Sequence, residues 1–145
     1  MKNIIAMLLG LALCSVMATA TGQEAKPYKE GSVTALSYIK IKPGKFDEYM
    51  KFLDTTYKML MEANKKAGLI VGYAVYSTQA RSLQEPDLIL ATTYANMAAL
   101  DKIDEGEAVA AKVIGSNDVQ NKTYIDRGAL REVLGGELIR ELILK

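Results

Sequence analysis

The sequence predicts an α+β domain with four strands and two helical regions, in the order β-α-β-β-α-β. Short runs rich in β-branched and aromatic residues alternate with segments whose apolar residues recur at helical spacing. Turn residues separate these segments, and the sequence shows neither an internal repeat nor a low-complexity tract. We therefore expect one domain at residues 32–145, preceded by a signal peptide at 1–20 and a polar linker at 21–31.

The first strand is expected at residues 33–41 and the first helix at 45–67. Pro43 and Gly44 stop the strand segment, whose two faces both carry apolar residues. The helical segment has an apolar stripe along one side, formed by Phe46, Tyr49, Met50, Leu53, Tyr57, Leu60 and Met61. Gly68 follows this segment and is well placed to end the helix.

The middle of the chain predicts two further strands, at residues 69–76 and 88–94. A polar connection that contains Pro86 joins them and suits an antiparallel hairpin with a long loop. Both segments are apolar on both faces, which is typical of a sheet covered on two sides.

A second helical region begins at Met97, with breaks expected at residues 104–106 and 115–116. Asn117 and Gln120 have the spacing of a capping box for a further helix to about Leu134. The glycine pair at 135–136 is expected to stop that helix. Residues 137–145 alternate charged and aliphatic side chains and predict a last strand, with a short helix as the alternative.

This order is the split β-α-β pattern of ferredoxin-like domains, an antiparallel sheet with helices on one face. Such a sheet leaves its other face bare. Because the predicted strands are apolar on both sides, we expect the bare face to pair with the sheet of a second copy, giving a homodimer.

The N-terminal segment has the anatomy of a secretory signal. Lys2 precedes an uncharged, mostly apolar run, and Ala18-Thr19-Ala20 has the small-x-small pattern of a cleavage site. We expect an exported protein, periplasmic or extracellular, without stable membrane insertion after cleavage. A retained anchor is one alternative, although the run is at the short end of the ~17–25 residues that a span requires. Lipidation of Cys14 is another, but Leu13 stands where lipoprotein signals have a small residue.

The charge balance excludes the simplest electrostatic partners. The chain has 18 basic and 17 acidic residues, and loss of residues 1–20 would remove only Lys2 from these totals. A balanced chain without a basic block gives no electrostatic reason to expect nucleic acid or anionic lipid as a partner.

The chain contains no histidine, and its single cysteine, Cys14, lies in the predicted signal peptide. Without these residues the usual zinc, copper and iron ligand sets cannot be assembled, so we expect no metal and no cofactor. Ser-His-Asp and Cys-His catalysis are excluded for the same reason. Any proton transfer would have to use Asp, Glu, Lys, Arg or Tyr.

Two segments resemble the dimeric α/β-barrel superfamily, which includes antibiotic-biosynthesis-monooxygenase-like and haem-degrading proteins. Residues 38–49, YIKIKPGKFDEY, are similar to its strand, Pro-Gly turn and helix opening, and residues 94–100, YANMAAL, to its junction between the third strand and the second helix. The resemblance implies a dimeric barrel. It does not extend to haem breakdown, because haem-degrading members have a histidine on the helix that this chain lacks. Cofactor-free oxygenases of the family have pockets of Tyr, Asn and Arg.

Four residues are candidates for a ligand site between helices and sheet: Ser37, Tyr49, Tyr94 and Arg140. The resemblance implies a polar pocket residue near Ser37 and an aromatic pocket wall at Tyr94. For Ser37, Tyr49 and Tyr94 the alternative is an ordinary place in the strand or the core. Arg140 shares an apolar face of the predicted last strand and therefore needs an acidic partner or a bound anion. Arg127 and Arg131, each beside an acid in the sequence, fit solvated helix faces.

Two functions fit these observations. The first is an exported binding protein for a small, largely apolar or aromatic molecule. The second is a cofactor-independent, monooxygenase-like enzyme that acts on an aromatic or polyketide-like substrate in the same pocket. No residue is assigned a catalytic role.

Overall fold

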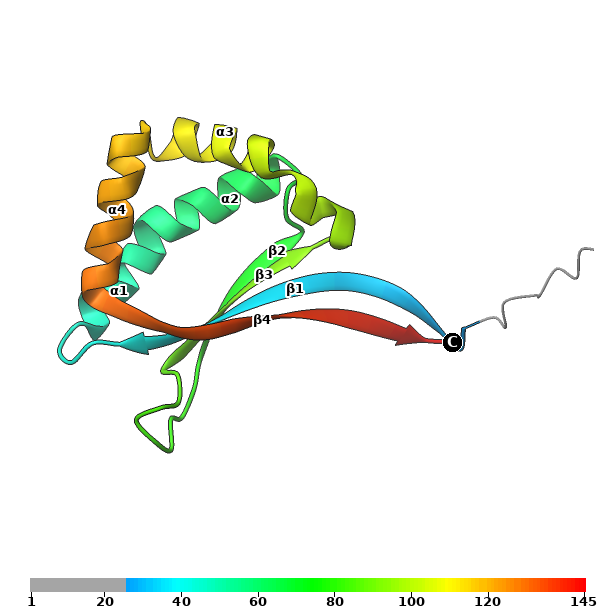
Figure 1. Cartoon of the computed structure of the whole chain (residues 1–145), viewed down its shortest axis with the longest axis horizontal. Helices are drawn as coiled ribbons and strands as arrows, with labels where there is room; N and C mark the ends of the chain where they lie inside the picture. Colours follow the sequence, from blue (N-terminus) through cyan, green and yellow to red (C-terminus); the bar gives the residue numbers. More distant parts are fainter. Residues whose placement is uncertain (1–25) are drawn as a thin grey trace, which may run out of the picture.

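The computed structural model describes residues 26–145, which form a four-stranded sheet with helices packed against it (Figure 1). In chain order the elements are β1 (Tyr28–Ile41), α1 (Phe46–Phe52), η1 (Leu53–Tyr57), α2 (Lys58–Lys66), β2 (Gly72–Ser77), β3 (Leu88–Tyr94), η2 (Met97–Asp101), α3 (Ile103–Val113), α4 (Asn117–Leu130) and β4 (Arg131–Leu144). This order confirms the predicted α+β, ferredoxin-like class. The predicted signal peptide lies outside the described residues, and residues 28–31 of the expected linker belong to β1.

The sheet is antiparallel throughout, with the strand order β2-β3-β1-β4. Ile39 lies opposite Leu88 and Val33 opposite Tyr94, so these four side chains share one face. All the helices lie on that side of the sheet (Figure 1). We call the opposite side, to which Leu36, Ala91 and Ile139 belong by the same alternation, the open face.

The core lies between the first helical segment and the sheet. Tyr49 and Ile39 are completely buried, and they cluster with Leu53, Tyr57, Leu88 and Leu90. The apolar stripe predicted from the sequence therefore faces the sheet. Gly68 ends this segment at a φ of 71°, a left-handed conformation that favours glycine, as expected.

The first helical segment contains a feature that its periodicity did not predict. Residues Leu53–Tyr57 form a π-helix between α1 and α2, and both end residues are buried. Wide turns of this kind occur mostly inside α-helices and often at functional sites. Here the turn lets Tyr49, Leu53 and Tyr57 all face the sheet.

Three expected boundaries in the second half of the chain differ from the structure. The break expected near residues 104–106 falls at Lys102, between η2 and α3, and α3 itself continues through residues 104–106. The capping box fails, because the N-cap of α4 is Ser116 and Gln120 donates to the Gly115 carbonyl at 2.9 Å. Strand β4 starts at Arg131, so the glycine pair lies inside a strand. The pairing of β1 with β4 shifts there, between Tyr38 and Ile39, as at a β-bulge.

Strands β1 and β4 extend beyond β3 as a two-stranded arm (Figure 1). In the arm, Arg140 donates to Glu30 at 2.7 Å and the Ser32 hydroxyl donates to Glu141 at 3.2 Å. The aliphatic side chains of β4 are exposed, including Leu142, Ile143 and Leu144. Among residues 26–145, no helix has the length and apolar character needed to cross a membrane.

Candidate ligand site

Two adjoining cavities lie between the helices and the sheet. The strand-side cavity, about 320 Å³, is lined by residues of α2, β3, η2 and α3. The helix-side cavity, about 330 Å³, is lined by residues of η1, α2, α3 and α4. Leu60 and Ala110 line both. Each volume is within the range of sites for small organic molecules.

The strand-side cavity has an apolar wall with few polar groups. Leu60, Leu69, Ile70 and Leu100 contribute aliphatic surface, while Thr92 and Tyr94 come from the end of β3. Asn64 also lines this cavity and donates to the Leu60 carbonyl at 3.0 Å. A small number of polar groups in an apolar wall is the usual composition of a ligand pocket.

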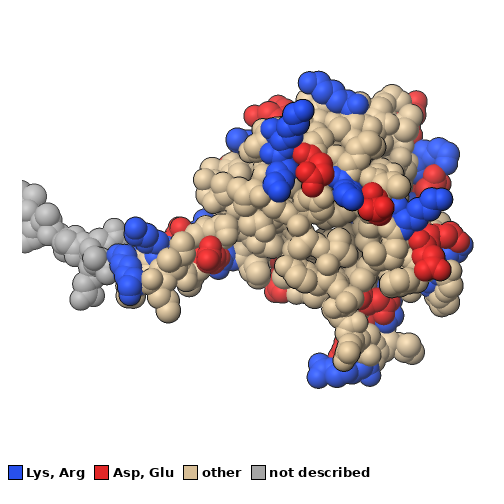
Figure 2. All heavy atoms as spheres, turned by 180° about the vertical axis from the view of Figure 1, so that it is seen from behind, with Lys and Arg blue, Asp and Glu red and all other residues tan. Residues whose placement is uncertain are grey.

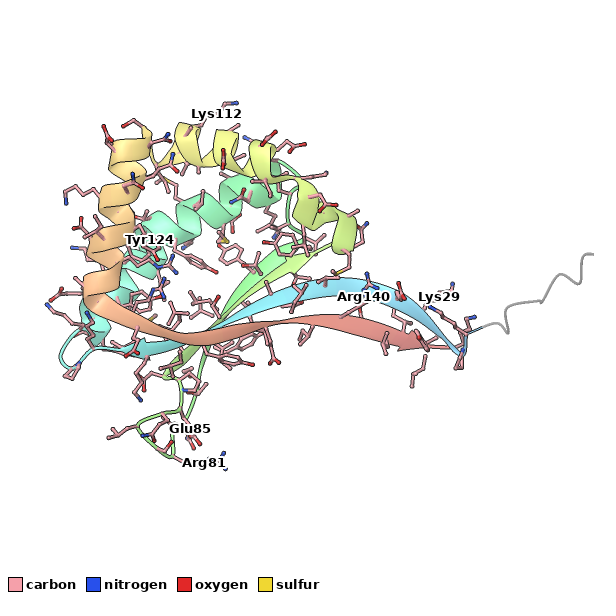
Figure 3. The ribbon with its side chains drawn as sticks, viewed as in Figure 1. Lys29, Arg81, Glu85, Lys112, Tyr124 and Arg140 are labelled. Atoms are coloured by element: carbon pink, nitrogen blue, oxygen red, sulfur yellow. The ribbon has the colours of Figure 1, made fainter. Side chains whose placement is uncertain are left out.

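The helix-side cavity is lined by aromatic rings and one guanidinium. Phe52 and Tyr57 come from the first helical segment, and Tyr124 and Arg127 come from α4. Figure 3 shows Tyr124 on α4, the helix that closes this side of the molecule. The Arg127 guanidinium lies 5.3 Å from the centre of the Phe52 ring and 6.0 Å from that of Tyr57, within the range of cation–π contacts.

Two buried phenol groups lie next to these cavities without hydrogen-bond partners. The Tyr49 hydroxyl is completely buried and has no partner among residues 26–145, whereas the Tyr57 hydroxyl, in a side chain that is 8% exposed, makes no well-formed hydrogen bond and has the Thr92 side chain close enough to lower its pKa. Burial raises the pKa of Tyr57, Thr92 and Arg127 act in the opposite direction, and Tyr49 and Tyr94 raise it further. Tyr57 thus lies close enough to Tyr49, Tyr94 and Arg127 for their charges to interact.

Arg127 in the last turn of α4 and Arg131, the first residue of β4, both extend over aromatic rings of the first helical segment. The Arg131 guanidinium lies 6.0 Å from the centre of the Tyr49 ring. Burial lowers the pKa of Arg131, and the neighbouring charge of Arg127 lowers it further. The Nε atoms of both arginines are buried without a partner, and neither side chain forms an ion pair within the described part of the chain.

The acidic residues next to these arginines in the sequence are directed elsewhere. Asp126 pairs with Lys122 at 2.6 Å on the exposed side of α4. Glu132 lies opposite Lys40 in the sheet, on the open face. The expected solvated pairs of Arg127 with Asp126 and of Arg131 with Glu132 are therefore wrong.

The structure brings together two of the four residues singled out in the sequence. Tyr94 lines the strand-side cavity, and Tyr49 lies beside Tyr57 and Arg131. Ser37 is on the helix-facing side of β1, opposite Leu90, but lines neither cavity. Arg140 lies on the arm with Glu30, distant from both cavities (Figure 3).

Sequence reasoning missed Tyr57, Arg127 and Arg131 as site residues. The available signal was the four-residue spacing of the two arginines, which would place both on one face of the helix expected to reach about Leu134. In the structure Arg127 is in α4 and Arg131 is the first residue of β4. Their acidic neighbours are one residue away and cannot share that face. The cluster contains no metal-type ligands, and residues 26–145 contain no group of three or more His, Cys, Asp or Glu side chains that could hold a metal ion.

No protein-family model matches this chain, and no curated protein matches it. Solved structures do share its fold. HapK from Hahella chejuensis aligns with a TM-score of 0.50 at 12% identity, covering 75% of this chain and 91% of HapK. Protein SO0527 from Shewanella oneidensis gives 0.52 at 16% identity, covering 80% and 98%. A dimeric ferredoxin-like protein from an uncultured marine organism gives 0.50 at 9% identity, covering 81% and 98%.

These matches define the class of the fold. The chain is a ferredoxin-like α+β protein whose structural neighbours include a protein described as dimeric. At such low identity the likeness shows the fold alone. Function has to be argued from the cavities and the side chains around them.

Proposed function

We propose that this protein binds a small, largely apolar or aromatic molecule in the two adjoining cavities between the helices and the sheet. The observation that carries the proposal is a cluster of polar groups at the helix-side cavity: Tyr57 and Arg127 line it, and Tyr49 and Arg131 lie behind them without lining either cavity. Most buried polar groups in native proteins have a hydrogen-bond partner, and one left without costs roughly 1–3 kcal/mol. The hydroxyls of Tyr49 and Tyr57 and the Nε atoms of the partly exposed Arg127 and Arg131 are four such polar atoms in one region.

The same geometry favours binding over proton abstraction. A monooxygenase-like reaction without a cofactor would need a base near the substrate. The pKa of Tyr57 is raised, so its hydroxyl keeps its proton at neutral pH and acts as a hydrogen-bond donor. The polar groups that surround the cavities are therefore suited to hold a ligand.

The open face of the sheet supports a homodimer as the working form. A hollow of about 440 Å³ on that face is lined mainly by small and apolar residues, among them Leu36, Ala74, Ala91 and Ile139. Along β4 the exposed Ile143 lies on the same side as Ile139 and continues this surface into the arm, whereas Leu142 and Leu144 lie on the other side. A contiguous exposed apolar surface usually marks an interface, and one structural neighbour is described as dimeric.

We also propose that the domain acts after export, in the periplasm or outside the cell. The support is the sequence of residues 1–20, with its single basic residue, apolar run and Ala18-Thr19-Ala20. Intact-mass analysis of the protein from its native host should give a chain that starts at about Thr21. A full-length mass in the cytoplasmic fraction would contradict export.

Filling the cavities tests the binding proposal. Ala110 lines both, so Ala110→Phe should remove any co-purifying molecule from the native mass spectrum and abolish binding of added naphthalene compounds. The neighbouring Ala111 lines neither and is exposed, which makes Ala111→Phe the matched control. Equal binding by both variants would contradict a ligand in these cavities.

Tyr94 tests the strand-side cavity. Tyr94→Phe removes only a hydroxyl and should leave the fold intact. If that hydroxyl contacts the ligand, its loss should weaken binding by about 0.5–1.5 kcal/mol, the net value of one hydrogen bond. Unchanged affinity in a folded Tyr94→Ala variant would remove the residue from the site.

A further inference from the structure

From the arrangement of Arg127, Arg131, Tyr49 and Tyr57, we infer that the ligand is an organic anion: a flat, unsaturated molecule with a carboxylate. This inference rests on the proposed function and specifies its ligand class. Three features support it: the two arginines, the two phenols and the shape of the cavity.

Arg127 and Arg131 carry two positive charges without an acidic partner in the described part of the chain. Arginines that are partly buried are normally paired, because a desolvated charge is costly. Arg127 and Arg131 lie close enough for one to lower the pKa of the other, and no carboxylate of the described chain pairs with either. The aromatic rings beneath them supply only part of the missing stabilisation, about 0.5–1 kcal/mol for a contact near the surface. A carboxylate between the two guanidiniums would pair with both and neutralise one of their two positive charges.

The phenol groups point to the same kind of ligand. The hydroxyls of Tyr49 and Tyr57 are hydrogen-bond donors, and a carboxylate accepts hydrogen bonds from such groups. Guanidinium groups bind carboxylates through two parallel hydrogen bonds, a geometry that a neutral ligand does not use. The cluster therefore combines donors with positive charge and contains no acidic side chain.

The cavity beside the cluster indicates the rest of the molecule. Arg127 forms part of the wall of the helix-side cavity, together with Phe52, Tyr57 and Tyr124. Aromatic side chains pack favourably on flat π systems. A carboxylate at the arginines would thus place an unsaturated ring system among these rings.

The test compares two probes that differ in charge and hardly in shape, 2-naphthoate and its neutral amide, 2-naphthamide. Isothermal titration of the full domain should show naphthoate binding at least tenfold more tightly. Arg127→Gln and Arg131→Gln should each weaken naphthoate about tenfold and leave naphthamide unchanged. Lys122→Gln removes an equal charge from the exposed side of the same helix, where Lys122 pairs with Asp126, and should change neither affinity.

Each outcome either supports or contradicts the anion site. Equal affinity for the two probes, or weakening of naphthoate by Lys122→Gln as strong as by the arginine variants, would overturn the anion site and leave the cavity as a neutral binding site. Binding of neither probe by the folded wild-type protein would overturn both the anion site and the proposed function. Circular dichroism spectra show which variants are folded, and Arg127→Lys, which keeps the charge, provides a second variant if Arg127→Gln is unfolded.

Discussion

At the scale of single residues, polar groups without partners around the site lower the stability of the ligand-free protein. Tyr49 and Tyr57 supply apolar ring surface to the core, yet their hydroxyls have no partner among residues 26–145. Arg131 adds a partly desolvated charge beside the charge of Arg127. A ligand that pairs with these groups would supply the hydrogen-bond and ion-pair partners that they lack in the ligand-free protein.

The first prediction concerns Arg131. Replacing it in Arg131→Met keeps most of the side-chain volume and removes the unpaired charge. We expect the free energy of unfolding of the ligand-free domain to rise by about 1 kcal/mol, the lower end of the effect seen when buried ions are replaced by apolar residues. Chemical denaturation in urea measures this.

Lys122→Met is the matched control for that variant. Lys122 is an exposed lysine of α4 paired with Asp126, so its replacement should change stability by no more than about 0.5 kcal/mol. If Arg131 were held only by its contact with the Tyr49 ring, Arg131→Met would destabilise the domain instead. A loss of stability would therefore contradict the view that Arg131 is kept for binding.

The site residues were only partly predictable from the sequence. Tyr94 and Tyr49 could be proposed, because one ends a strand at a junction and the other lies on an apolar helix face. Tyr57 belongs to the same stripe, but nothing local shows that its hydroxyl has no partner. The missing partners of the two arginines depend on where α4 packs, which no local pattern contains.

At the scale of elements, strand β4 shows how a local rule can fail. Two glycines after a helical pattern normally end a helix. Here they lie at a bulge inside β4, where the strand passes very close to β1. A Cβ atom built on Gly136 would lie 2.6 Å from the Leu36 carbonyl oxygen, which is closer than real contacts allow. The close approach of β4 to β1 therefore requires glycine at position 136.

The second prediction follows from this close approach. In Gly136→Ala, one of the two backbones has to move, so we expect the free energy of unfolding to fall by about 1–3 kcal/mol, as in other overpacked positions. Gly128→Ala is the control with the opposite sign. Gly128 lies in α4 with no heavy atom within 4 Å of an added Cβ, so alanine should stabilise the domain by about 0.5–1 kcal/mol. Equal effects of the two changes on urea midpoints would contradict this explanation.

The strong periodic segments were predicted well, and the interruptions were not. Residues 88–94 form β3 as expected, and the stripe from Phe46 to Met61 faces the sheet. The π-turn at Leu53–Tyr57 was missed, because the same apolar residues also fit a regular helix. The break expected near residues 104–106 lies at Lys102 instead, and α3 continues past Gly106, since a single glycine is tolerated inside a helix.

At the scale of the whole molecule, the open face carries exposed apolar side chains that a second copy could cover. The third prediction is a homodimer formed through the open face. Light scattering of the domain should give about twice the monomer mass. Ile139 lines the hollow on that face, so Ile139→Glu would place a charge in the interface and should yield a monomer.

Ile125→Glu is the control for that substitution. Ile125 is 69% exposed on α4, on the helical side of the molecule, and its replacement should leave the dimer intact. A stable monomer of the wild-type domain at micromolar concentration would contradict pairing through the sheet. Acidic and basic side chains are interspersed on the side of the molecule seen in Figure 2, which agrees with the balanced composition.

The central claim is that a small molecule binds between the helices and the sheet. The most direct test is a titration of the isotope-labelled domain with 2-naphthoate, followed by two-dimensional amide NMR. We predict the largest chemical-shift changes at residues 52–60, at Thr92 and Tyr94, and from Gln120 in α4 to Arg131 at the start of β4, with little change at Leu36, Ala91 or Ile139. Changes confined to the open face, or no changes at a probe concentration near its solubility limit, would contradict the account.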